Sequence, residues 1–302
     1  MKVLVFVSGI FVAITALALF PAATGIEQLP IPTNSFLNQV VKPIDLNRDF
    51  DFAGEPLPMS NDDVKQRLDR ELLLNAYSQA NMMMNLKRTG EVFPTIERIL
   101  AEEGIPDDFK YLAVAESNLV NQATSSVGAK GVWQFMPGTA KEYSMEVNDE
   151  IDERLDLEKA TRSACKFIRY LHNRYGSWIM AAAAYNMGAS GLNRDATAQK
   201  MDKYWDIQLN QETLRYVFRV VAIKDIMRNP EAYGFFIEQR HKYPEPYNFS
   251  TIEVNTSVPS WVDFAVANGS SLRLIKFYNP WIVGGSLANK SGKAYQVRVS
   301  TR

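Results

Sequence analysis

The chain has 302 residues and a mass of 34.1 kDa, with 46% hydrophobic and 22% charged residues. Its 33 lysines and arginines against 34 aspartates and glutamates give a net charge of −1. These values are ordinary for a folded protein and exclude a disordered chain, and the lack of a basic excess argues against nucleic-acid binding. A single cysteine, Cys165, excludes an intrachain disulfide, and with only two histidines a zinc site built from His and Cys is not expected.

The first 25 residues have the layout of a secretory signal peptide. Lys2 precedes an uncharged apolar run from Val3 to Phe20, and small residues follow up to Gly25. A retained single-span membrane anchor is the alternative, because the run is slightly long for a signal and slightly short for a spanning helix. In either case the sequence predicts a location in the bacterial periplasm or cell envelope, with membrane association if the segment is retained.

Residues 26–60 contain five prolines and are expected to form an extended leader or linker. Residues 61–240 carry apolar positions at helical spacing and are expected to form an all-helical domain. Gly90 is expected to end the first helix and Pro94 to open the second. The expected helices cover residues 61–88, 94–103, 106–116, 157–175, 178–187 and 211–228, with a short helix opening at Pro137. The segment 178–187 is apolar nearly all round, which predicts a buried central helix.

Residues 241–302 are expected to form a small βααβ module. Alternating strands are expected at 251–254 and 294–299, and short helices at 262–268 and 271–277. The predicted fold class is therefore mainly α, with an all-helical domain followed by this module.

Glu116 stands at the end of an apolar helix. Five of the six residues from Tyr111 to Glu116 are apolar or aromatic, so its carboxyl is expected to be partly desolvated and its pKa raised. A carboxylic acid that stays protonated suits a general acid. A solvated glutamate at a helix end is the alternative interpretation.

Two further segments carry polar groups among apolar ones. Gly131 permits a tight turn before Trp133-Gln134-Phe135. An aromatic ring beside an amide suits sugar binding, whereas the alternative is that the aromatics anchor the loop in the core. Tyr185 and Asn186 follow a run of four alanines, and buried polar groups there need partners, in either a functional or a structural role.

Together these segments resemble the catalytic domain of the family 1 lytic transglycosylases, lysozyme-like enzymes that cut bacterial peptidoglycan. The resemblance runs from about Ile96 to Arg228, and the type it is most similar to is membrane-bound lytic murein transglycosylase D. The matching motifs are Glu116-Ser117, Gly131 to Pro137 with Thr139-Ala140, Ala184-Tyr185-Asn186, and Gln211 to Val217. The resemblance implies a lysozyme-like fold, peptidoglycan glycan strands as the partner, and no cofactor or metal.

The resemblance also implies that Glu116 is the single catalytic acid/base. It would protonate the oxygen between N-acetylmuramic acid and N-acetylglucosamine, and then accept the proton of the C6 hydroxyl that closes a 1,6-anhydro ring. A retaining hydrolase needs a second carboxylate about 5 Å from the first. Residues 117–141 contain no Asp or Glu, although an acid distant in sequence could still fold into the site.

The remaining matched positions are implied to contact the substrate. Ser117 and Gln134 match residues that orient the sugar and the leaving group. Tyr185 matches a residue close to the acid, Asn186 one that helps to stabilise charge near C1, and Tyr216 one in the cleft wall.

The C-terminal residues resemble a lysin-motif (LysM) domain, a small fold that binds chitin-like glycans. The match is carried by Asp263-Phe264-Ala265, Asn268-Gly269, Leu272, Leu274-Ile275 and Tyr278-Asn279-Pro280. The usual Gly-Asp-Thr after the first strand is replaced by Val258-Pro259-Ser260. Two roles stay open, binding to wall glycan and packing against the catalytic domain. If the module binds wall glycan, deletion of residues 241–302 is expected to weaken binding to the wall more than the rate of cleavage.

The leading function is that of a periplasmic lytic transglycosylase. The alternatives are a hydrolytic muramidase of the same fold, which would leave reducing ends, and a peptidoglycan-binding protein that has the fold without the activity. The intact Glu116, Gln134, Tyr185 and Asn186 speak against the last.

Overall fold

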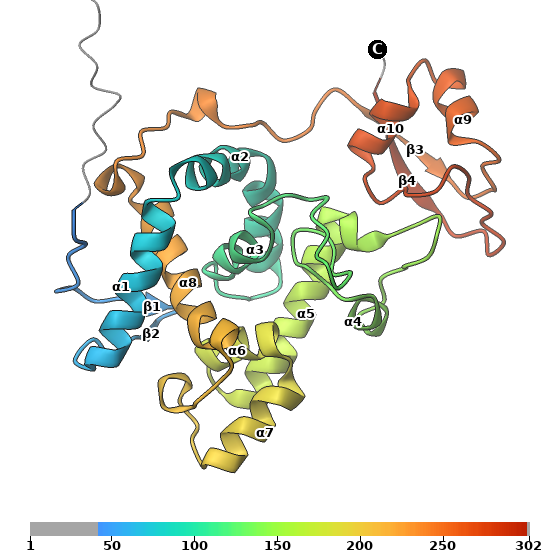
Figure 1. Ribbon diagram of the computed structural model, residues 1–302. Coiled ribbons are helices and arrows are strands. Elements are labelled where there is room, and N and C mark those ends of the chain that lie inside the picture. The colour runs from blue at the N-terminus through green and yellow to red at the C-terminus, as the bar shows by residue number, and fades with distance from the viewer. Residues whose placement is uncertain (1–41, 301–302) are drawn as a thin grey trace, which may run out of the picture. The chain divides into compact units, whose positions relative to one another are not determined.

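The computed structural model describes residues 42–300, so the predicted signal peptide and the start of the leader lie outside the described residues. Residues 62–228 are mostly helical, and a module of two strands and two helices follows them (Figure 1). The predicted mainly helical class with a small βααβ module is confirmed. The helices of the larger part are α1 (Asp62–Ala76), α2 (Gln79–Glu102), α3 (Phe109–Ser117), α4 (Pro137–Glu142), α5 (Leu157–Tyr175), α6 (Trp178–Met187), α7 (Ala189–Gln199) and α8 (Gln211–Arg228).

Helices α6 and α8 lie at the centre of the packing. Helix α8 contacts α1, α3 and α6, and α5 packs against α2 and α6 (Figure 1). All residues from Ile179 to Ala184 are buried, and the four alanines among them let neighbouring helices approach closely. The prediction of a buried central helix at 178–187 is confirmed.

The end of the predicted linker belongs to the core. A short antiparallel hairpin, β1 (Asp51–Phe52) and β2 (Glu55–Pro56), precedes α1. The side chains of Phe50, Phe52 and Leu57 are buried among the helices. The expectation of an extended linker up to residue 60 is therefore wrong for these residues, because three large apolar side chains outweigh the prolines around them.

The hairpin also caps a helix that leads to the site. The carboxylate of Glu55 accepts hydrogen bonds from the hydroxyl of Ser177 and from the N–H groups of Trp178 and Ile179. These N–H groups have no partner within α6, and a negative charge is favourable at a helix N-terminus. The hairpin thus holds the end of α6 opposite to Tyr185.

Helix α2 runs through Gly90 and Pro94, where the sequence predicts a break. Pro94 has no N–H to bond the carbonyl four residues before it, at a cost of about 3 kcal/mol. Val92 and Ile96 are buried on either side, and each such burial contributes about 1.5–3 kcal/mol. Gly90 has another purpose, since a Cβ there would lie 2.5 Å from the carbonyl oxygen of Tyr243.

The other helix bounds vary in how closely they follow the sequence pattern. Helices α5, α6 and α8 have the predicted bounds, and α3 begins three residues later than expected. The break between α1 and α2 at Tyr77 and Ser78 and the whole of α7 were not predicted.

The C-terminal module has the predicted order of elements. Strands β3 (Ser250–Val254) and β4 (Tyr295–Val299) pair antiparallel, and helices α9 (Trp261–Ala267) and α10 (Leu272–Tyr278) lie between them in the chain. Trp261 is fully buried in a core separate from that of the helical domain.

Two residues of the helical domain complete this second core. Ile151 and Leu155, from the segment 146–155 between α4 and α5, are 0% and 7% exposed among the module's apolar side chains. A backbone bridge pairs Ile151 with Ile282. The two domains therefore share a core at this segment.

Cys165 lies on α5 and is fully buried, as a small hydrophobic residue would be. Burial raises the pKa of its thiol to about 12. Between residues 42 and 300, no helix combines the length and apolarity needed to cross a membrane.

Candidate active site

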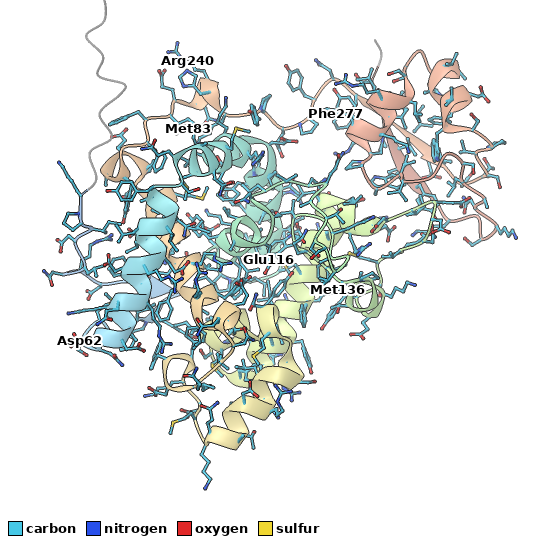
Figure 2. The ribbon with its side chains drawn as sticks, in the orientation of Figure 1. Asp62, Met83, Glu116, Met136, Arg240 and Phe277 are labelled. Carbon is cyan, nitrogen blue, oxygen red and sulfur yellow. The ribbon has the colours of Figure 1, made fainter. Side chains whose placement is uncertain are left out.

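Glu116 is the penultimate residue of α3 and lies in the middle of the helical domain (Figure 2). The residues from Tyr111 to Val114 are buried, so the apolar body of the helix carries the carboxyl into a half-buried position. Burial raises the pKa of Glu116 from 4.5 to about 7, because desolvation disfavours the carboxylate. The predicted upward shift of the pKa is confirmed.

Tyr216 on α8 is hydrogen-bonded to this carboxyl. Its ring is 1% exposed, and its hydroxyl donates to Oε1 of Glu116. The bond stabilises the carboxylate and so opposes the effect of burial on the pKa of Glu116. Burial and the nearby carboxylate raise the pKa of Tyr216 well above its usual value, so the phenol remains a donor.

Two charged side chains of α8 act on Glu116 at longer range. Glu212, Tyr216 and Arg219 are spaced by four and three residues, which places them on one face of α8. Arg219 lowers the pKa of Glu116 and Glu212 raises it. The two pair with each other at 2.9 Å, and Arg219 also lies 3.7 Å from the buried Glu71. Because Arg219 and Glu212 shift the pKa of Glu116 in opposite directions, burial remains the largest influence on this pKa.

Gln134 is held in an unusual conformation. Its φ of 49° lies in the left-handed region, which non-glycine residues adopt rarely and mostly at turns or functional sites. The side-chain Nε2 donates to the carbonyls of Ala123 (3.2 Å) and Gly131 (2.9 Å). Both donor hydrogens are thus used within the loop, which fixes the direction of the amide.

The aromatic neighbours of Gln134 anchor the loop. Trp133 is 0% exposed and Phe135 is 3% exposed, and the indole N–H of Trp133 donates to the hydroxyl of Thr161 at 2.9 Å. The interpretation that these two rings stack on sugars is therefore wrong. The alternative, that they anchor the loop in the core, describes them instead.

Tyr185 and Asn186 connect the end of α6 to this loop and to α8. The hydroxyl of Tyr185 donates to the carbonyl of Trp133 at 2.7 Å. Burial, with a further contribution from the charge of Glu116, raises the pKa of Tyr185 well above its usual value. The amide oxygen of Asn186 accepts from the hydroxyl of Thr213 at 2.9 Å. These contacts bring α3, α6, α8 and the loop together around Glu116.

Ser117 is placed differently from the other predicted site residues. It is buried, and its hydroxyl donates to the carbonyl of Ala113 at 3.0 Å within its own helix.

Sequence reasoning missed the contacts that hold the end of α3. Asn118 follows Ser117 and is left-handed, with a φ of 52°. Its side-chain oxygen accepts from Asn81 and Asn85 at 3.1 Å each, and its carbonyl accepts from Arg88 at 3.1 Å. The three donors are spaced by four and three residues on α2, a pattern of polar residues on one helix face that the sequence does contain.

Within residues 42–300, no three His, Cys, Asp or Glu side chains are grouped so that they could hold a metal ion.

The model of the family described as Transglycosylase SLT domain matches residues 94–208, which include Glu116, Gln134 and Tyr185. Residues 94–208 therefore resemble an SLT domain. A second model, for the soluble lytic transglycosylase C-terminal LysM-like domain, matches residues 250–302. Both resemblances found in the sequence are thereby confirmed. Tyr216 lies beyond the matched part of the SLT domain, so its place in the site depends on the geometry.

The chain also has relatives among known proteins. The chain is similar to membrane-bound lytic murein transglycosylase D of Escherichia coli (strain K12), with 25% identity over 252 residues, 81% of this chain and 54% of the relative. It is 34% identical over 94 residues to a putative tributyltin chloride resistance protein of Alteromonas sp. (strain M-1), 31% of this chain and 45% of the relative. The chain spans about half the length of the curated relatives it matches.

A solved structure also matches. The 70 kDa soluble lytic transglycosylase SLT70 of Escherichia coli aligns with a TM-score of 0.41 and 22% identity, over 54% of this chain and 31% of that chain.

Proposed function

We propose that the protein is a peptidoglycan lytic transglycosylase with Glu116 as its single acid/base. The observation that carries the proposal is the carboxyl of Glu116, half-buried at the end of an apolar helix in an SLT domain, with a pKa raised to about 7. A group with this pKa is present in both protonation states near neutral pH, as acid and base catalysis by one residue requires.

The proposed reaction uses the carboxyl of Glu116 twice, first to donate one proton and then to accept another. Protonated Glu116 donates to the glycosidic oxygen between N-acetylmuramic acid and N-acetylglucosamine, and the bond from C1 to this oxygen breaks. The C6 hydroxyl of the same muramic acid attacks C1 and gives its proton to Glu116, which restores the acid. The nucleophile belongs to the substrate, so no second molecule has to be brought in.

The other site residues have supporting roles in this proposal. Tyr216 donates to Glu116 and stabilises the carboxylate formed after the first proton transfer. Gln134, fixed by its own loop, orients the sugar. Asn186 helps to stabilise charge near C1, and Tyr185 acts close to the acid.

The test is a digestion of purified peptidoglycan with residues 26–302, followed by mass spectrometry of the fragments. Products lighter by one water than hydrolysed muropeptides, carrying 1,6-anhydro ends, are expected. Reducing ends would instead show that water is the nucleophile and that the protein is a hydrolytic muramidase. Binding to peptidoglycan without any cleavage would favour the binding-protein alternative.

Two isosteric variants test which carboxylate is needed for cleavage. Glu116→Gln is expected to abolish cleavage, because the amide cannot supply the proton. Glu212→Gln is the matched control, since Glu212 is the described carboxylate whose charge acts on Glu116. Cleavage by Glu212→Gln is expected to persist, whereas its loss would indicate a two-carboxylate mechanism.

The same reasoning places the protein in the cell envelope, where peptidoglycan is found. The match to a relative that is named membrane-bound supports this location, and the apolar segment at 3–20 would provide export or anchoring.

A further inference from the structure

Arg154 braces the loop that presents Gln134. Its guanidinium is 4% exposed and donates to the carbonyls of Gly128 at 2.8 Å and Phe135 at 3.1 Å. Within the loop of residues 123–136, these carbonyls lie on either side of Gln134, so one planar side chain ties the two parts of the loop together. The main chain of Arg154 also bounds the loop, because a Cβ at Gly131 would lie 2.0 Å from its carbonyl oxygen.

Arg154 is itself fixed by Asp152. Its Nε and Nη2 both donate to the carboxylate of Asp152 at 2.8 Å, a paired geometry that sets the plane of the guanidinium. Lys130, within the loop, lies 3.3 Å from the same carboxylate. The position of the loop therefore follows that of Asp152.

The C-terminal module holds the backbone around Asp152 from the other side. The N–H of Asp152 donates to the carbonyl of Trp281 at 2.9 Å. The N–H groups of Val283 and Gly284 both donate to the carbonyl of Glu150 at 3.0 Å. Since these are main-chain bonds, they fix the backbone itself.

Side chains strengthen the same contact. Lys293 of the module lies 2.7 Å from Glu146 and 2.9 Å from Glu153, and the hydroxyl of Tyr295 donates to Glu146 at 2.9 Å. Ile151 is completely buried among the module's apolar residues. Segment 146–155 is thus held on one side by the module and holds the loop on the other.

We propose that the C-terminal module positions the Gln134 loop through Arg154 and Asp152, and so contributes to the chemical step in addition to any contact with the wall. Arg154 is then a positioning residue. The inference rests on the proposed function, because it assigns the loop a role in cleavage. It predicts that disturbing the module's contact with segment 146–155 slows cleavage even of short soluble glycan strands.

The test uses two adjacent glycines in the full chain. A Cβ at Gly284 would lie 2.9 Å from the Cα of Glu150 and 3.2 Å from the carbonyl oxygen of Asp149, whereas a Cβ at Gly285 meets nothing within 4 Å. Gly284→Ala therefore pushes the module away from segment 146–155, and Gly285→Ala is its matched control. For each, kcat and KM on soluble glycan strands, binding to sedimented sacculi, and hydrogen exchange of residues 123–136 are measured.

Gly284→Ala is expected to lower kcat about tenfold or more, as small misplacements of positioned groups do, with faster exchange in residues 123–136 and unchanged sacculus binding. Gly285→Ala should match the wild type in all three measurements. Equal kcat and equal exchange for the two variants would overturn the proposal. If the wild type cleaves nothing, the proposed function fails, and the exchange data still decide whether the module positions the loop.

A second variant guards against misfolding of Gly284→Ala. Arg154→Lys keeps the charge but cannot span both carbonyls and Asp152 with one planar group, so the same fall in kcat and rise in exchange are expected. Arg194→Lys on α7, where the side chain is 72% exposed and pairs with its neighbour Asp195, is its control and should behave as the wild type. Wild-type kcat for Arg154→Lys in a folded protein would contradict the positioning role.

Discussion

Tyr216 sets how far burial shifts the pKa of Glu116. Its hydroxyl favours the carboxylate, so removing it leaves burial less opposed. Tyr216→Phe is expected to raise the pKa of Glu116 above about 7 and to move the basic limb of the pH profile of kcat/KM to higher pH.

The control for this variant is Tyr204→Phe. Tyr204 is also buried, but its hydroxyl donates to the carbonyl of Thr213 and not to Glu116. Its pH profile should stay where that of the wild type lies. An unshifted profile for Tyr216→Phe would show that the phenol does not stabilise the carboxylate.

The raised pKa of Glu116 also links stability to pH. A carboxyl with a pKa of about 7 in the fold and 4.5 outside it favours the fold fully below pH 4.5, and this contribution is lost as the pH rises through 7. The loss is on the order of 3 kcal/mol. Glutamine does not titrate, so the stability of Glu116→Gln lacks this pH dependence. The melting temperature of the variant minus that of the wild type is therefore expected to be higher at pH 8 than at pH 4. Calorimetry at both pH values measures this gain, and a difference that does not change with pH would contradict it.

At the residue scale, the sequence predicts what depends on neighbours in the chain. The apolar run before Glu116 correctly indicated a desolvated carboxyl. Its partner Tyr216 lies 100 residues further along, and nothing local pairs the two, so the hydrogen bond follows only from the packing of α3 against α8. Trp133 and Phe135 show a second limit of the sequence, because their pattern is compatible with both sugar stacking and anchoring in the core.

At the scale of the helix, Gly90 shows why local rules failed for α2. The glycine is kept where the segment after α8 crosses the helix, with the carbonyl of Tyr243 2.5 Å and Cβ of Lys242 2.9 Å from the position of a Cβ. Propensity alone favours alanine in a helix by about 1 kcal/mol. The glycine that locally suggests a helix end is therefore present because residues 242–243 approach the helix closely at this point.

Gly90→Ala is accordingly expected to destabilise the protein by about 1–3 kcal/mol, the usual cost of overpacking. Gly138→Ala in α4 is the contrast, because a Cβ there meets nothing within 4 Å, and a neutral or stabilising effect of up to about 1 kcal/mol is expected. Urea unfolding of both variants measures the difference. A stabilising Gly90→Ala would mean that the contact with residues 242–243 yields without cost.

At the scale of the whole chain, the structure changes the expectation for removing the C-terminal module. The sequence suggests that wall binding suffers more than chemistry, but Ile151 and Leu155 would be exposed by the deletion. Each loses about 1.5–3 kcal/mol of burial, so a chain ending at residue 249 is expected to melt roughly 6–24 °C lower and to cleave soluble glycan more slowly. Unchanged melting and kcat would return the module to a wall-binding role alone.

This shared core could not be predicted from the sequence. The order of strands and helices in the module follows from its alternating and helical patterns, as does the helical class of the larger domain. Segment 146–155, by contrast, is rich in acidic residues and resembles an exposed loop. Glu146 and Glu153 meet Lys293 only when the two domains are in contact, and charge patterning carries no information on a partner 140 residues away.

The burial of Cys165 has a practical consequence for labelling. It is the only cysteine of the chain, and with a fully buried thiol whose pKa is about 12 it presents almost no thiolate to alkylating reagents. A cysteine introduced at a solvent-facing position, such as Phe277 at 58% exposure, would then be the reactive one. Fluorophores or spin probes can therefore be attached at chosen points on either domain, without first removing the native thiol, to follow interdomain distances during turnover.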